Sequence, residues 1–305
     1  MVRLFNTNFE NLILPFFIVT NLNILLPLYN DWRSCNILIK KINEQLRKKK
    51  RFGNILILDD ASTQKINVTR SGLKNIRKIK VLKLKKNLGS QKIISIGLDF
   101  IKNEKNRIIV IMDSDGEDDV NQINNLIDTA EKNKNYIAVA SRVKRKEHLI
   151  FRILYKIHLI ITFLLTFNWI SFGNYSSFHS SNIKKILKNN SSWLAYSSCV
   201  AKNCKIIKIS TNRQKRFFGK SKLSFLGLFN HSFRVLSVFQ NKILIISILY
   251  LLIINFFLYK KFSIQIIMIS FILIYNFLIF ITSKNNDNFL FFKKDKFIKR
   301  VLKVK

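Results

Sequence analysis

Short apolar runs and amphipathic stretches alternate along the first half of the chain. Apolar runs of about four to eight residues rich in Ile, Leu and Val predict buried strands, and apolar residues at helical spacing between them predict helices. The predicted strands are residues 23–28, 54–58, 80–84, 136–140, 205–209 and a central run that begins at Ile108. Strands and helices that alternate in this order predict an α/β fold with a Rossmann-like, mostly parallel sheet and helices on both faces.

The second half of the chain is more apolar. Residues 149–172 and 223–240 mix cations or histidines with large apolar side chains, which is typical of amphipathic helices at a membrane interface. Residues 243–259 and 262–282 contain no charged side chain and are long enough to cross a bilayer core. The pattern therefore predicts a C-terminal hairpin of two transmembrane helices. The alternative is a pair of helices buried in a soluble protein.

These changes of pattern divide the chain into five parts. We expect an N-terminal extension at residues 1–20, an α/β domain at 21–221, an amphipathic interfacial helix at 222–241, two transmembrane helices at 242–283 and a basic cytoplasmic tail at 284–305. In this division the sheet is complete before the hairpin begins.

The distribution of cations predicts how the hairpin is oriented. Six lysines and arginines lie within twenty residues after Thr282, whereas only Lys260 and Lys261 separate the two apolar segments. Because basic flanks stay on the cytoplasmic side, both termini and the α/β domain are expected in the cytoplasm. The predicted location is the inner, cytoplasmic membrane, with more than one pass.

Lysine and arginine number 53 against 17 acidic residues, which gives a formal net charge of +36. Such an excess is typical of proteins that bind nucleic acid or an anionic membrane surface. The chain has no groove-reading or base-stacking motif, so we do not expect nucleic acid as a partner. The membrane is the better partner for the charge.

Acidic residues follow the central strand directly, in the sequence IIVIMDSDGEDDV from Ile108. Asp113 and Asp115 are two positions apart, so an extended backbone turns both carboxylates to one side and Ser114 to the other. Two carboxylates suit Mg²⁺ or Mn²⁺, because such a cation takes few protein ligands and completes its shell with water and phosphate oxygens. The alternative is an acidic turn in which Asp118 and Asp119 cap the following helix.

Four segments carry a resemblance to a known family. The sequences LPLYND, LILDDAST, NLGSQKIISIGL and IVIMDSDGEDD, in this order, are similar to the signature segments of family 2 glycosyltransferases of GT-A fold. The segment from Arg213 to Lys222 resembles the R-x-x-R-x-x-G-x-S-K segment of the polyprenyl-phosphate glycosyltransferases, which include dolichol-phosphate mannose synthases and bactoprenol glucosyltransferases. The resemblance implies a nucleotide-sugar donor, a divalent metal and a lipid phosphate acceptor. It leaves open whether the chain forms a homo-oligomer.

The resemblance also implies roles for individual residues. The implied donor-binding residues are Pro27, Tyr29, Asp59, Asp60, Asn87, Gly89, Asp113 and Ser114. The implied metal ligands are Asp113 and Asp115, and the implied acceptor-phosphate residues are Arg213, Arg216, Ser221 and Lys222. Asp113, Asp115, Arg213 and Arg216 are the expected catalytic residues. A basic surface that touches lipid headgroups is the alternative for the arginine segment.

One segment departs from the family pattern. Where relatives carry an acid shortly before a phenylalanine, this chain has Ser177 before Phe178, and Asn182 replaces a later acid. A phosphate acceptor is already largely dianionic near neutral pH and needs little general-base help, so the loss is tolerable for such an acceptor. The expected function is transfer of a sugar to polyprenyl phosphate for cell-envelope glycans. The alternatives are another glycan or lipid acceptor, or a weak relative that serves as a binding partner.

Overall fold

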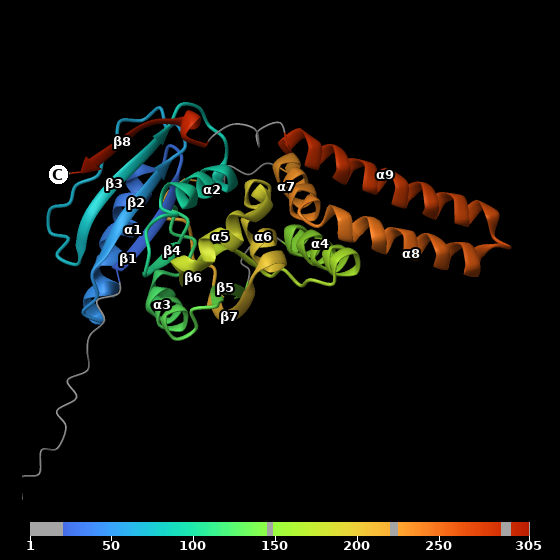
Figure 1. The fold of residues 1–305 in the computed structure, drawn as a ribbon, viewed down its shortest axis with the longest axis horizontal. Helices are drawn as coiled ribbons and strands as arrows, with labels where there is room; N and C mark the ends of the chain where they lie inside the picture. Colours follow the sequence, from blue (N-terminus) through green and yellow to red (C-terminus); the bar gives the residue numbers. More distant parts are fainter. Residues whose placement is uncertain (1–20, 145–148, 220–224, 288–293, 305) are drawn as a thin grey trace, which may run out of the picture.

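The computed structural model describes residues 21–144, 149–219, 225–287 and 294–304 (Figure 1). The predicted extension at 1–20 and the predicted phosphate-binding residues Ser221 and Lys222 lie outside these ranges. The described part of the chain forms an eight-stranded sheet in the order β7-β5-β6-β4-β1-β2-β3-β8. The strands are β1 (Asn21–Leu28), β2 (Gly53–Asp59), β3 (Ile76–Leu84), β4 (Arg107–Ile111), β5 (Tyr136–Lys144), β6 (Phe172–His179), β7 (Lys205–Asn212) and β8 (Ile298–Val304).

Most neighbouring strands in the sheet are parallel. The pairs β1–β2, β1–β4, β2–β3 and β5–β7 are parallel, and β6 and β8 supply the antiparallel pairs. The longer helices are α1 (Trp32–Lys48), α2 (Ser90–Phe100), α3 (Ile123–Lys132), α4 (Leu149–Thr166), α6 (Tyr196–Asn203), α7 (Phe225–Ser237), α8 (Gln240–Leu258) and α9 (Phe262–Asp287). The short α5 is Ile183–Leu187, and four 3-10 turns complete the described structure. The predicted α/β class with a mostly parallel sheet is confirmed.

Helices cover both faces of the sheet because alternate strand residues point to opposite sides. In β1, Leu25 packs into the core beneath α2, α5 and α6, whereas Ile24 and Leu26 pack with α1 and α3 on the other face. All three are fully buried. Parallel strands covered on both faces need continuous apolar runs, and this explains why the strand segments lack alternation with polar residues.

Two strands differ from the sequence-based expectation. β6 lies in the polar stretch that follows α4, and it pairs with both β4 and β5. β8 follows the apolar hairpin and pairs antiparallel with β3, with Lys83 opposite Arg300 and Val81 opposite Leu302. The expectation that the sheet is complete before the hairpin is therefore wrong. Residues 298–304 are its edge strand rather than a free basic tail.

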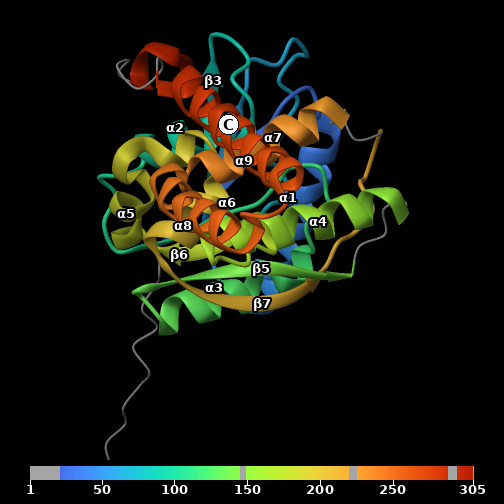
Figure 2. The same cartoon turned by 90° about the vertical axis from the view of Figure 1, so that its right-hand side faces the viewer.

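The apolar helices lie beside the sheet and join its hydrophobic core at one end through Phe233, Ile243 and Ile279. Figures 1 and 2 show α8 and α9 side by side, with α4 and α7 near the end of the pair that is closer to the sheet. Two segments, Gln240–Leu258 and Phe262–Lys284, are long and apolar enough to span a membrane. Only 22% and 11% of their apolar windows are buried, so most of this surface is open in the structure. The side-chain amide of Asn276 donates to the Ser247 hydroxyl at 2.8 Å and links the two helices.

Candidate active site

The acidic residues after β4 form a tight turn at the carboxyl edge of the sheet. The Asp113 N–H donates to the Asp118 carboxylate at 3.1 Å, and the Glu117 N–H donates to Asp115 at 3.0 Å. Gly116 closes the turn with a φ of +86°, a conformation that glycine adopts without a steric cost. Asp119 accepts from the Asn121 N–H, so the expected capping role belongs to Asp119, whereas Asp118 holds the turn itself.

Asp113 is positioned by a chain of side-chain hydrogen bonds. The Asn174 amide, on β6, donates to the Asp113 carboxylate at 3.0 Å and accepts from Gln91 at 3.1 Å. Gln91, in the first turn of α2, also accepts from the Tyr196 N–H at 2.6 Å. This network fixes the direction of the first carboxylate.

Burial and neighbouring acids act on both carboxylates of the pair. Burial, followed by the charges of Asp118 and Asp115, raises the pKa of Asp113 to about 7. The pKa of Asp115 is also raised, chiefly by burial, while Arg216 opposes that rise. Groups that repel one another in this way are stabilised as anions by an added cation.

Two carboxylates at one end of a strand fit a hard divalent cation. Asp113 and Asp115 would hold it, and water and donor phosphate oxygens would complete the shell. Across the described residues, no cluster of three or more His, Cys, Asp or Glu side chains forms a closed metal cage.

The arginine segment lies along the acidic turn. The Arg216 guanidinium is 3.1 Å from the Asp31 carboxylate and 3.3 Å from the Asp115 carboxylate. Arg213 forms an ion pair with Glu117. The backbone follows the same path, because the Phe217 N–H donates to the Asp115 carbonyl at 3.0 Å. Two residues predicted to act together with Asp115 are thus brought within contact distance of its turn.

The predicted donor residues at the end of β2 have distinct surroundings. One Asp59 oxygen accepts from the Ser62 N–H at 2.8 Å, and the other lies 3.6 Å from the Lys83 ammonium. Asp60 accepts from the backbone N–H groups of Leu88 and Gly89 at 2.8 and 2.7 Å. Asp59 therefore caps the turn at Ser62, and Asp60 ties the end of β2 to the start of α2.

The other predicted donor residues lie at the same edge. Pro27 is on β1 opposite Leu58, and Tyr29 follows β1 with its ring exposed. Asn87 is exposed in the loop before α2, and Gly89 has a φ of +90° at the helix start. Ser114 is buried, as its position between the two acids implies. Parallel pairing of β1 with β2 and β4 brings these strand ends to one edge.

Sequence reasoning missed several residues of this site. Asn174 and Asp31 contact the predicted catalytic groups directly, and Arg142 lies 3.3 Å from the Asp118 carboxylate. Asn30 joins the loops after β1 and β2, because its side chain accepts from the Thr63 N–H at 2.9 Å. Asn30 and Asp31 fall in the LPLYND segment, which could have identified them.

Ser177 lies away from this edge. It is fully buried in β6 between Val110 of β4 and Ala138 of β5, and its hydroxyl has no hydrogen-bond partner among the residues that the structure describes. An ionised carboxylate would be costly at such a place without a partner. The serine is therefore compatible with the packing that surrounds it.

Comparisons with solved structures show similar folds at low identity. Glucosyl-3-phosphoglycerate synthase from Mycobacterium tuberculosis, solved with Mn²⁺, UDP-glucose and phosphoglyceric acid, has a TM-score of 0.51 and 10% identity over 73% of this chain and 80% of that one. Residues 1–349 of S. aureus TarS have a TM-score of 0.44 and 13% identity over 73% of this chain, which spans 65% of that one. Mannosyl-3-phosphoglycerate synthase from Rubrobacter xylanophilus has a TM-score of 0.47 and 12% identity, covering 73% and 74%.

Sequence comparison gives the family. No curated protein sequence matches the chain. Residues 23–192 match the model of Glycosyl transferase family 2, and this range contains most of β1, all of β2 to β6, the acidic turn and both aspartates at the end of β2. Because the match covers more than half of the 305 residues, the chain belongs to glycosyl transferase family 2.

Proposed function

We propose that this glycosyltransferase moves a sugar from a nucleotide-sugar donor to a polyprenyl phosphate at the cytoplasmic face of the inner membrane, for cell-envelope glycan synthesis. The observation that carries the proposal is the contact between the arginine segment and the acidic turn. Arg216 lies 3.3 Å from Asp115, so a cationic phosphate-binding group is adjacent to the carboxylates assigned to the donor.

Asp113 and Asp115 are the residues that we assign to binding of the nucleotide-sugar donor. They would hold Mg²⁺ or Mn²⁺, and the bound cation would neutralise charge on the donor diphosphate. The structure of the Mycobacterium tuberculosis glucosyl-3-phosphoglycerate synthase contains Mn²⁺ and UDP-glucose. This supports a nucleotide-sugar donor with a divalent metal here.

Arg213 and Arg216 are the residues that we assign to binding of the acceptor phosphate. An oxygen of the acceptor phosphate attacks the anomeric carbon, the bond from that carbon to the diphosphate breaks, and the nucleoside diphosphate leaves. A guanidinium binds phosphate oxygens with two parallel hydrogen bonds, so it can orient the attacking oxygen. No proton has to be removed from a dianionic phosphate, which is consistent with a neutral Ser177 where relatives carry an acid.

The membrane part of the proposal rests on exposed apolar helices. The surfaces of α4 and α7 expose large side chains that include Phe163, Leu164 and Phe229. α8 and α9 expose apolar side chains over most of their length, and burial of such surface in lipid is strongly favourable. β8 returns to the sheet after α9, so both ends of the hairpin lie on the side of the catalytic domain.

Labelled nucleotide sugars test the proposal directly. Membranes that carry the full chain are incubated with a panel of labelled donors, with and without added polyprenyl phosphate, and the label is followed into the lipid phase. We expect acceptor-dependent label in the lipid phase, and none with Asp115→Asn. Label in a glycan or soluble phosphorylated product would identify another acceptor. Donor binding without transfer would make the chain a binding partner rather than an enzyme.

A further inference from the structure

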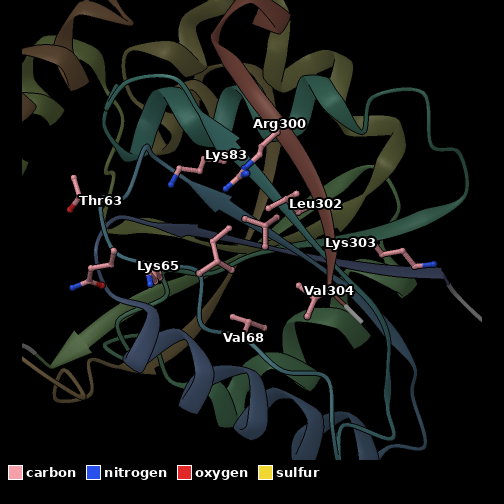
Figure 3. A pocket seen from close by; sticks show the side chains of 11 residues that line it. Thr63, Lys65, Val68, Lys83, Arg300, Leu302, Lys303 and Val304 are labelled. Carbon is pink, nitrogen blue, oxygen red and sulfur yellow. The ribbon is translucent and has the colours of Figure 1, made fainter.

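A pocket lies between β3, β8 and the loop 63–68, on the side of the sheet that faces α1 (Figure 3). Its volume is about 550 Å³. This is within the range of about 300 to 1,000 Å³ that holds small ligands in proteins. None of the residues assigned to the metal or the acceptor lines it.

The floor of the pocket is apolar. Val81 of β3 stands opposite Leu302 of β8, and Val304 follows two residues later on the same face. Ile66 and Val68 of the loop form the facing wall. Such a floor suits the apolar or planar body of an organic ligand.

One end of the pocket is cationic. Lys83 and Arg300 are directly opposite in the β3–β8 pairing, and Figure 3 shows both side chains at the same end of the pocket. Lys65 lines it from the loop, and none of the described lining residues is acidic. Like charges directly opposite on neighbouring strands destabilise a sheet, and an anion between them would reduce the repulsion that the Asp59 carboxylate beside Lys83 leaves.

The Lys83 ammonium is already held in place. It donates to the Ser62 carbonyl at 2.8 Å and lies 3.6 Å from the buried Asp59 carboxylate. Its side chain is only 15% exposed. A cation fixed before the ligand arrives loses little conformational freedom on binding, which favours a specific site over general attraction.

We propose that this pocket binds a small phosphorylated organic anion, with the phosphate between Lys83 and Arg300 and the apolar body on Val81 and Leu302. An arginine fork beside a lysine matches a phosphate group. The ligand is soluble rather than a bilayer lipid, because β8 and the tip of the α8–α9 hairpin lie at opposite ends of the molecule (Figure 1). The proposal does not depend on the identity of the acceptor.

Phenyl phosphate and inorganic phosphate are suitable probes for the purified full chain in detergent. Calorimetric titration should show phenyl phosphate binding more tightly than phosphate, since only the former covers the floor. Arg300→Gln should weaken binding of phenyl phosphate by about tenfold or more. Lys80→Gln is the matched control, because Lys80 is exposed on β3 and points to the other face. It should change the affinity by less than about twofold.

Several outcomes would overturn the proposal. The first is that phenyl phosphate does not bind, and the second is that the two probes bind with equal affinity. The third is that Arg300→Gln and Lys80→Gln weaken the binding equally, which would indicate general attraction to a basic surface. If Arg300→Gln leaves the affinity for phenyl phosphate unchanged, the probe binds at another site. Lys65 lies on the loop outside the sheet, so Lys65→Gln provides a second test if the Arg300→Gln variant does not fold. It should also weaken the binding of phenyl phosphate, and an unchanged affinity would contradict the site.

Discussion

Gly116→Ala should separate the arginine segment from the acidic turn. An added Cβ at this position would lie 2.5 to 2.6 Å from three carbon atoms of the Phe217 ring. Ordinary carbon contacts are about 3.5 to 4.0 Å, so the ring has to move by about 1 Å. The Phe217 N–H donates to the Asp115 carbonyl, so we expect this movement to pull Arg216 from Asp115 as well.

Two separable costs set the size of the effect. The φ of +86° at Gly116 costs an L-residue about 1 to 2 kcal/mol. Crowding against Phe217 adds about 1 to 3 kcal/mol. Gly72 has a φ of +77° with nothing within 4 Å of its added Cβ, so Gly72→Ala carries only the first cost. The free energy of unfolding should therefore fall further in Gly116→Ala than in Gly72→Ala, by about 1 to 3 kcal/mol.

Urea unfolding of the detergent-solubilised chain measures the stability difference, and transfer of labelled sugar measures the functional one. We expect transfer to fall at least about tenfold in Gly116→Ala, from loss of a charge-assisted contact, and to persist in Gly72→Ala. In a Phe217→Ala background the crowding is gone, so Gly116→Ala should cost only as much stability as Gly72→Ala. Equal stability losses in the two single variants, together with undiminished transfer, would refute the placement of residues 213–217 along the turn.

Other substitutions test the remaining assignments. Asp115→Asn should abolish transfer and weaken the donor affinity measured in Mg²⁺ or Mn²⁺, and full activity or insensitivity to a chelator would remove the metal assignment. Arg216→Ala should reduce transfer to polyprenyl phosphate about ten- to a hundredfold with little change in the apparent donor constant, and Arg216→Lys should recover part of it; equal loss of donor affinity would assign the arginine to the diphosphate. Asp60→Asn leaves one amide oxygen for two N–H donors and should lower the free energy of unfolding by about 1 to 3 kcal/mol in urea titrations, whereas an unchanged midpoint would contradict the Leu88 and Gly89 contacts. Removal of Ile298–Val304 should expose the β3 edge and cause aggregation detectable by size-exclusion chromatography, and a monodisperse product of unchanged stability would contradict the β8 pairing.

The strands of the parallel half could be predicted because their apolar runs leave little choice of position. Residues 54–58, for example, lie within β2, and a polar turn ends the run at the ligand-binding edge as expected. The acidic turn after Ile108 was predicted for the same reason. A buried strand that stops at acids places carboxylates at the edge of the sheet, whatever the rest of the chain does.

The two unexpected strands have weaker signals. β6 reads FGNYSSFH. Its buried residues include Ser176 and Ser177, so the segment lacks the apolar pattern by which a buried strand is recognised in a sequence. β8 reads IKRVLKV, and its three cations made it look like a tail after the hairpin. Its apolar residues at Ile298, Leu302 and Val304 were the available signal for a strand with one covered face.

Contacts between distant segments could not be predicted from the sequence. Asp59 and Asp60 are adjacent, and only the folded structure decides that one caps Ser62 and the other binds Leu88 and Gly89. The same holds for Arg216, whose partner Asp31 is 185 residues away in the chain. Local propensity carries no information about such pairs.

β8 has a consequence for the order of events during synthesis. Its partner β3 ends at Leu84, so more than two hundred residues, including both apolar helices, leave the ribosome before β8 is made. Domains fold progressively from the N-terminus as they emerge, and pairings of such large sequence separation form slowly. β3 is therefore an unpaired edge strand of the nascent sheet during the time in which α8 and α9 are synthesised and take up their positions. β8 can pair with β3 only after the end of α9 has come close to the sheet, so completion of the sheet follows placement of the hairpin.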